Sequence, residues 1–161
     1  MKIFITGIVA SGKSTLAKKV SKQFGIPHYE ADCIVHVKTD NGRYKRTPEE
    51  QVQEIMRIDA LGDWIIEGVY RQSYHCLLDL SDKIIFLDTP LWLRKYRIIT
   101  RFIKQQLHIE HCDYKSDLHM LKMMFKWTKD FENNRKQFDE MMTMYKNKLS
   151  ITRNSNTRLK Y

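Results

Sequence analysis

The stretch that decides the fold is MKIFITGIVASGKSTLAKKV, residues 1–20. Within it, Gly7 is followed after four residues by Gly12, Lys13 and Ser14, which is the spacing of a loop that cradles phosphate groups. Glycines let the backbone approach an anion closely, and successive N–H groups from Gly12 to Thr15 can point at it. We therefore expect the phosphate-binding residues to be Gly7, Ala10, Ser11, Gly12, Lys13, Ser14 and Thr15.

The residues on either side supply the context that this loop requires. Residues 2–6 form a short apolar run typical of a buried strand. Residues 14–24 place their apolar side chains on one helical face, and Gly25 is a helix stop. The start of this helix would favour phosphates, while Lys13 would neutralise the β- and γ-phosphates of ATP and Ser14 would reach Mg²⁺. The alternative is a Gly/Ser-rich turn without a ligand.

Composition sets the class of protein. The chain has 161 residues, 42% of them hydrophobic, which predicts one domain (1–161) with a proper core. No apolar run reaches the length of a membrane span, and the N-terminal residues do not predict a secretory signal. Cys33, Cys76 and Cys112 are scattered, which favours reduced thiols and a cytoplasmic location.

Charge is distributed unevenly along the chain. Residues 1–88 contain 12 Lys and Arg against 12 Asp and Glu, whereas residues 89–161 contain 16 against 7. The whole formal net charge of +9 therefore lies in the second half. This asymmetry predicts an anionic partner for that half, either the phosphates of a nucleotide or a nucleic acid.

Strand-like and helix-like segments alternate along the chain. The expected strands are residues 2–6, 26–32, 63–68, 82–88 and 149–152. The expected helices are residues 14–24, 47–61, 73–80, 89–107 and 116–148, with a break near residue 130, and residues 38–46 and 108–115 are expected loops. This order predicts a three-layer α/β/α fold around a parallel sheet of about five strands. Asp32, Glu67 and Asp88 fall at the carboxyl ends of strands, where ligands bind in such sheets.

Two later motifs resemble a known family. Glu67-Gly68-Val69-Tyr70-Arg71 resembles the Asp-Gly-Phe-Pro-Arg stretch of adenylate kinases. The runs at residues 64–70 (WIIEGVY) and 86–93 (FLDTPLWL) are closer to a bacterial group of small adenylate-kinase-like ATPases, the DNA topology modulation proteins. The resemblance covers about residues 1–130. It implies a P-loop NTPase of the nucleotide-kinase type, with ATP and Mg²⁺ as cofactors and a helical lid at about residues 102–130.

The resemblance also implies roles for individual residues. Arg71 would grip the transferred phosphate, and Arg97 and Arg101, on one face of a helix, would close on ATP. Asp32 matches the acid that, in shikimate-kinase-like enzymes, takes or orients the proton of the acceptor hydroxyl. Glu67 would hold Mg²⁺ through water, and Asp88 is a second candidate for the same role. Ordinary capping acids and surface arginines are the alternatives.

Some residues depart from the family pattern, and others are expected to have no role in binding or catalysis. Residues 108–116 lack the arginine-rich lid of nucleotide kinases. A zinc site at His108, Glu110, His111 and Cys112 is disfavoured because no second pair of ligands follows at the right spacing. Trp92 and Trp127 are expected in the core.

The leading hypothesis is an ATP-dependent kinase that phosphorylates a small acceptor, such as a nucleotide or nucleoside, in a cleft between Asp32, Tyr70 and Arg71. One alternative is a nucleic-acid-associated ATPase that uses the basic second half, although no helix-turn-helix or metal-finger pattern is visible. Another is a nucleotide-binding protein with little transferase activity. No membrane partner is expected.

Overall fold

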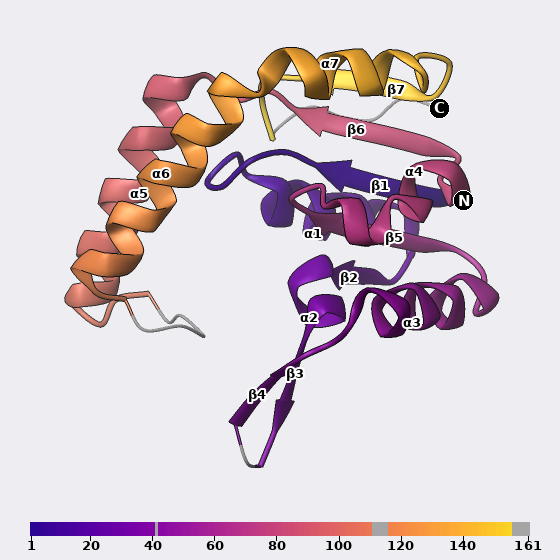
Figure 1. Cartoon of the computed structure of the whole chain (residues 1–161), viewed down its shortest axis with the longest axis horizontal. Coiled ribbons are helices and arrows are strands. Elements are labelled where there is room, and N and C mark those ends of the chain that lie inside the picture. The colour runs from indigo at the N-terminus through magenta and orange to yellow at the C-terminus, as the bar shows by residue number, and fades with distance from the viewer. Residues whose placement is uncertain (41, 111–115, 156–161) are drawn as a thin grey trace.

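The computed structural model describes residues 1–40, 42–110 and 116–155, which form a three-layer α/β/α arrangement around a five-stranded sheet (Figure 1). The strand order is β2-β5-β1-β6-β7, and every neighbouring pair is parallel. The strands are β1 (Lys2–Thr6), β2 (His28–Glu30), β5 (Trp64–Gly68), β6 (Lys83–Leu87) and β7 (Leu149–Thr152). The predicted fold class is confirmed, and β1 lies at the centre of the sheet.

Helices cover the sheet on both faces. They are α1 (Lys13–Phe24), α2 (Ala31–Val35), α3 (Pro48–Ala60), α4 (Cys76–Leu80), α5 (Leu91–Gln106), α6 (Leu118–Asn133) and α7 (Arg135–Thr143), with a 3₁₀ turn η1 (Gln72–Tyr74) before α4. Because side chains alternate along a strand, Ile3 and Ile5 of β1 pack against α1. Phe4 points to the opposite face and joins a core with residues of α2, α3, α4 and α7. Thr6 follows the same alternation and shares the face of Phe4.

Two local expectations are wrong. The strand expected at residues 26–32 ends at Glu30, and Asp32 lies in the first turn of α2 instead of at a strand end. The expected loop at 38–46 contains an antiparallel hairpin of β3 (His36–Thr39) and β4 (Gly42–Lys45). All four residues of β4 are exposed, so no alternation of apolar and polar residues marks it in the sequence.

The helical region after β6 also differs in part from the prediction. The helix expected at 116–148 breaks as predicted, but at Asn134 instead of near residue 130, and α7 ends at Thr143. Figure 1 shows α5 and α6 side by side, projecting beyond the sheet. Each therefore keeps one side toward solvent, and the expected core positions of Trp92 and Trp127 are corrected: these side chains are 70% and 41% exposed.

Two further findings concern the part of the chain that the structure describes. None of its helices is both long and apolar enough to cross a membrane. It holds no cluster of three or more metal-binding side chains. His111 and Cys112, named in the zinc reading, lie outside the described residues, as do residues 111–115 of the expected lid at 102–130.

Candidate phosphate-binding site

The loop between β1 and α1 is tightly wound. The Ser11 amide donates to the Ile8 carbonyl at 3.2 Å, while Ala10 and Gly12 have positive φ angles of 59° and 98°. The first hydrogen bond of α1 runs from the Leu16 amide to the Gly12 carbonyl at 3.1 Å. Amides ahead of it have no acceptor within the helix, so those of residues 13–15 can bind an anion at the positive end of α1.

Gly7 is required by its surroundings. A Cβ at this position would lie 2.8 Å from Ser11 Oγ and 2.9 Å from the Leu87 carbonyl oxygen. A backbone oxygen of β6 cannot move aside without disturbing the sheet, so a larger residue would push the loop away from its place. Because Gly7 has no side chain, the loop can lie directly against the end of β6.

Lys13 reaches back across the loop. Its Nζ donates to the Ile8 carbonyl at 3.1 Å. Desolvation lowers the pKa of Lys13, and the nearby Arg101 guanidinium acts in the same direction, while Glu67 and Asp32 oppose the shift. The partly buried Lys13 therefore holds its ammonium group over the loop, where it could meet an anion bound there.

Ser14 and Glu67 meet beside the loop. Ser14 Oγ donates to Glu67 Oε1 at 2.6 Å, and the Glu67 residue is only 5% exposed. Burial raises the pKa of Glu67, an effect that Lys13 and the Ser14 hydroxyl partly offset. The two residues come together because β5 pairs with β1 and brings its carboxyl end next to the start of α1.

These features fit ATP with Mg²⁺. The loop offers amides at a helix start, a lysine over the loop, and a hydroxyl next to a carboxylate, which are the oxygen ligands that Mg²⁺ takes alongside phosphate oxygens. The Ser11 Oγ is also buried without a hydrogen-bond partner among the described residues.

The two predicted helix arginines lie close to the loop. Arg97 Nη1 donates to the carbonyls of Ala10 and Ser11 at 3.2 and 3.0 Å. Arg101 Nε pairs with Glu110 Oε1 at 3.1 Å, and its charge is near enough to affect the pKa of Lys13. The structure thus brings Arg97 against the loop itself and Arg101 beside its lysine.

Asp32 and Arg71 form a pair at the same edge of the sheet. Arg71 Nη2 donates to Asp32 Oδ1 at 3.0 Å, and the Asp32 side chain is 71% exposed. Asp32 also contributes to the electrostatic surroundings of Lys13 and Glu67. Asp32 is not at a strand end, but the first turn of α2 places it next to Arg71. These are two of the residues predicted to surround the acceptor.

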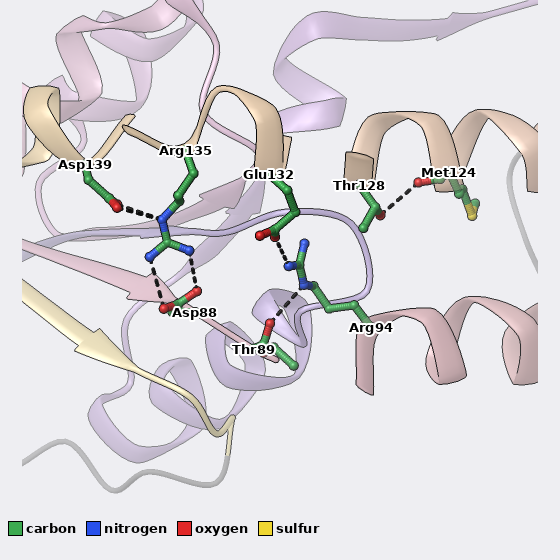
Figure 2. A network of polar contacts seen from close by, with 8 residues as sticks. All are labelled: Asp88, Thr89, Arg94, Met124, Thr128, Glu132, Arg135 and Asp139. Atoms are coloured by element: carbon green, nitrogen blue, oxygen red, sulfur yellow. Dashed lines mark hydrogen bonds and ion pairs between the residues drawn. The ribbon is translucent and has the colours of Figure 1, made fainter. Parts of the chain in front are cut away.

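The structure does not bring Asp88 to the predicted metal position. Both its oxygens accept from Arg135, at 2.7 and 3.0 Å, as Figure 2 shows. This pairing holds the pKa of Asp88 below its usual range. Asp88 follows β6, on the other side of β1 from Glu67, so its carboxylate faces the start of α7. Of the two strand-end acids, Glu67 therefore lies against Ser14 of the loop, whereas Asp88 is paired with Arg135.

Sequence reasoning missed the polar network around Arg94, which is 2% exposed. Its Nε donates to the Thr89 carbonyl at 2.9 Å and its Nη2 to Glu132 at the end of α6 (Figure 2). Thr89 in turn donates through Oγ1 to the Ser11 carbonyl at 2.8 Å. The network connects the loop to α5 and α6. Its one sequence signal is that Arg94 shares the inward face of α5 with Ile98.

A cavity of about 300 Å³ adjoins the loop and was also missed. Its walls come from the loop, the residues after β5, the end of β6 and the α6–α7 junction. The lining residues are Thr6, Gly7, Ile8, Val69, Tyr70, Phe86, Phe131, Asn134, Gln137, Phe138 and Met141.

Comparison with solved structures shows which proteins share this fold. Shikimate kinase from Bacteroides thetaiotaomicron superposes with a TM-score of 0.54 at 14% sequence identity, over 98% of this chain and 89% of that chain. Deoxyadenosine kinase from M. mycoides with bound dATP superposes with a TM-score of 0.53 at 16% sequence identity, over 98% of this chain and 93% of that chain. A gluconokinase from Sinorhizobium meliloti 1021 superposes with a TM-score of 0.50 at 18% sequence identity, over 78% of this chain and 73% of that chain.

No family model and no curated protein sequence matches the chain. The structural likeness, at identities below 20%, shows that the chain shares the fold of these three kinases and does not show its activity or substrate. The resemblance to the DNA topology modulation group is not confirmed by these comparisons.

Proposed function

We propose that this protein is an ATP-dependent phosphotransferase that moves the γ-phosphoryl group of ATP to a hydroxyl of a small acceptor. The observation that carries the proposal is the contact of Ser14 Oγ with Glu67 Oε1 directly behind a glycine loop crossed by Lys13. A turn without a ligand would have no need of positive φ angles at Ala10 and Gly12 together with an adjacent buried carboxylate and a lysine held over the turn.

The residues of the chain would act mainly by positioning and by neutralising charge. Bound ATP with Mg²⁺ would supply the phosphoryl group and polarise its oxygens. Lys13 would exchange its contact with the Ile8 carbonyl for phosphate oxygens. Ser14 would ligate the metal directly, and Glu67 would orient it through water. Arg97 would keep the loop carbonyls turned away from the phosphates by holding those of Ala10 and Ser11.

The acceptor would bind on the side of Asp32 and Arg71. Arg71 would release Asp32 to contact the transferred group, because a planar guanidinium suits phosphate oxygens. Asp32 would then accept or orient the proton of the acceptor hydroxyl. General-base assistance is a modest part of phosphoryl transfer, so we expect Asp32 variants to retain more activity than Lys13 variants.

The test is release of ADP from Mg·ATP in the presence of nucleosides, nucleotides, shikimate and gluconate. We expect one acceptor class to raise ADP release well above the rate in water alone, with the Lys13→Ala variant inactive. If no acceptor exceeds water while ATP still binds, the protein binds nucleotide without acting as a kinase.

A second candidate function is binding of nucleic acid by the α5–α6 region. Five lysines on these two helices are exposed: Lys95, Lys104, Lys122, Lys126 and Lys129. Phosphate contacts from such residues give affinity that falls steeply with salt. DNA binding with a log–log salt slope of several would support this function, and no binding at moderate salt would remove it.

A further inference from the structure

The cavity of about 300 Å³ lies on the face of the sheet that α7 covers, and it touches the phosphate loop directly through Gly7 and Ile8. Tyr70 and Val69, which precede the acceptor-side Arg71, form another wall. A group bound in this cavity would therefore contact the loop on one side and Tyr70, one residue of the predicted acceptor cleft, on another. Its volume is at the lower end for small-molecule sites, which suits a group of one or two rings.

Aromatic side chains form much of the cavity wall. Phe138 packs against Phe86 and Phe131 with ring centroids 4.9 and 5.4 Å apart, and Tyr70 meets Phe138 at 6.3 Å. The Arg135 guanidinium covers the Phe86 and Phe131 rings, at 5.2 and 5.6 Å from their centroids. These contacts fix the rings in place before a ligand arrives, so the apolar wall of the cavity is preformed.

None of the eleven lining residues is charged. A carboxylate or phosphate bound here would lose its water without gaining a counter-charge, which is strongly unfavourable. This lining therefore disfavours acceptors that place a carboxylate in the cavity, as shikimate or gluconate would.

Two kinds of polar group are nevertheless present. Thr6, which is 1% exposed, lines the cavity, and its Oγ1 has no hydrogen-bond partner within the described part of the chain. Two exposed carboxamides also line the cavity: Asn134, whose Nδ2 donates to the Asp130 carbonyl at 2.7 Å, and Gln137 in the first turn of α7. A carboxamide offers both donors and an acceptor, which matches the mixed edge of a heterocyclic base. The buried Thr6 hydroxyl would gain a partner on ligand binding.

We infer that this cavity holds the neutral heteroaromatic base of a nucleoside acceptor, between the aromatic wall and the Thr6 hydroxyl, with Asn134 and Gln137 at its edge. The inference rests on the proposed function and specifies its acceptor. A nucleoside hydroxyl oxygen would form the new bond to the γ-phosphorus as the bond from that phosphorus to the bridging oxygen breaks. ADP leaves with the bridging electron pair, and the hydroxyl proton passes to the Asp32 carboxylate.

The test measures binding of adenosine, guanosine, cytidine and thymidine to protein saturated with Mg·ADP, by calorimetry, with shikimate and gluconate for comparison. We expect at least one nucleoside to bind and to stimulate ADP release from Mg·ATP, and the two carboxylates to do neither. The inference is overturned if shikimate or gluconate binds and no nucleoside does, or if none of the six binds to ADP-loaded protein.

Two variants locate the ligand. Thr6→Val keeps the shape of the side chain but removes the hydroxyl, so nucleoside affinity should fall about tenfold for one lost hydrogen bond. Its melting temperature should rise, because a buried hydroxyl without a partner is removed. Gln137→Leu should also weaken nucleoside binding, whereas the matched control Lys136→Leu, on an exposed neighbour, should not.

Binding of ADP and pyrophosphate separates the possible failures. Both should bind Thr6→Val as well as they bind the unaltered protein. If Thr6→Val and Gln137→Leu weaken ADP as much as nucleosides, the cavity holds the base of the phosphate donor and the acceptor assignment is wrong. If ADP and pyrophosphate fail to bind the unaltered protein at all, the proposed function fails instead, whatever the nucleosides do.

Discussion

Ser14 Oγ donates a hydrogen bond to Glu67 Oε1 at 2.6 Å and so joins the first turn of α1 to the end of β5, across 53 residues of sequence. The contact places a hydroxyl and a carboxylate next to the helix start that would hold phosphates. Since Glu67 is buried and Lys13 is close enough to affect its pKa, the three side chains form one electrostatic unit.

The first prediction concerns pH. Burial raises the pKa of Glu67 above 4.5 and lowers that of Lys13 below 10.5. Mg·ATP binding should therefore weaken in acid, where Glu67 gains a proton, and in alkali, where Lys13 loses its charge. Glu67→Gln should remove the acid limb, and Lys13→Arg should remove the alkaline limb because arginine stays charged. Calorimetry from pH 5 to 10 checks this. An acid limb that persists unchanged in Glu67→Gln would contradict it, and Glu49→Gln is the exposed control.

The second prediction concerns the arginine behind the loop. Arg97→Ala removes both hydrogen bonds to the Ala10 and Ser11 carbonyls. A hydrogen bond from a charged donor stabilises a folded structure by about 1.5–3 kcal/mol. We expect ADP and pyrophosphate affinity to fall by about tenfold or more because the loop loses its brace. Lys95→Ala, on the exposed face of the same helix, should leave affinity unchanged. Equal affinities in the two variants would show that Arg97 does not organise the loop.

The third prediction separates stability from metal binding at Asp88. Asp88→Asn should lower the free energy of unfolding by about 1–3 kcal/mol at pH 7, because Arg135 loses a bidentate partner in a partly buried place. The pKa of Asp88 is lowered in the folded state, so its contribution is present above the ordinary value of 3.8 and disappears as pH falls through the folded value.

Urea unfolding of this variant at pH 7 and at low pH tests the stability effect, and the difference from the unaltered protein should shrink in acid. Magnesium-dependent ATP binding should survive the substitution. If Asp88→Asn instead abolishes that binding at unchanged stability, the carboxylate serves the metal after all.

The fourth prediction concerns Gly68, which follows Glu67 at the end of β5. A Cβ at this position would lie 2.4 Å from Ala31 Cβ in α2, so Gly68→Ala should cost about 1–3 kcal/mol of stability through overpacking. Ala31→Gly in the same background removes the opposing methyl group and should recover part of the loss. Urea midpoints measure both, and an unshifted midpoint for Gly68→Ala would contradict the packing described.

The parts of the fold that sequence could predict are those with strong local signals. Residues 2–6 and 149–152 are strands as expected, and the Thr47 capping box with Pro48 marks the start of α3. The hairpin of β3 and β4 could not be predicted because β4 buries neither face. The break between α6 and α7 was expected near residue 130, and it lies four residues later, at Asn134.

The candidate site divides in the same way. Lys13, Ser14 and Glu67 could be assigned from spacing and from strand ends, and the structure brings them together. Asp88 has the same strand-end signal as Glu67, yet its surroundings differ because Arg135, 47 residues later, faces it. The cavity could not be predicted at all, since its walls come from four segments that meet only in the folded chain.

The most direct measurement is calorimetry of ATP, ADP and pyrophosphate with magnesium, on the unaltered protein and on Lys13→Ala and Lys18→Ala. We predict that all three ligands bind, that Lys13→Ala weakens them by about tenfold to a hundredfold through the loss of a charged donor, and that the exposed Lys18 is dispensable. If folded protein binds none of the three, the loop is not a phosphate site and the account is contradicted.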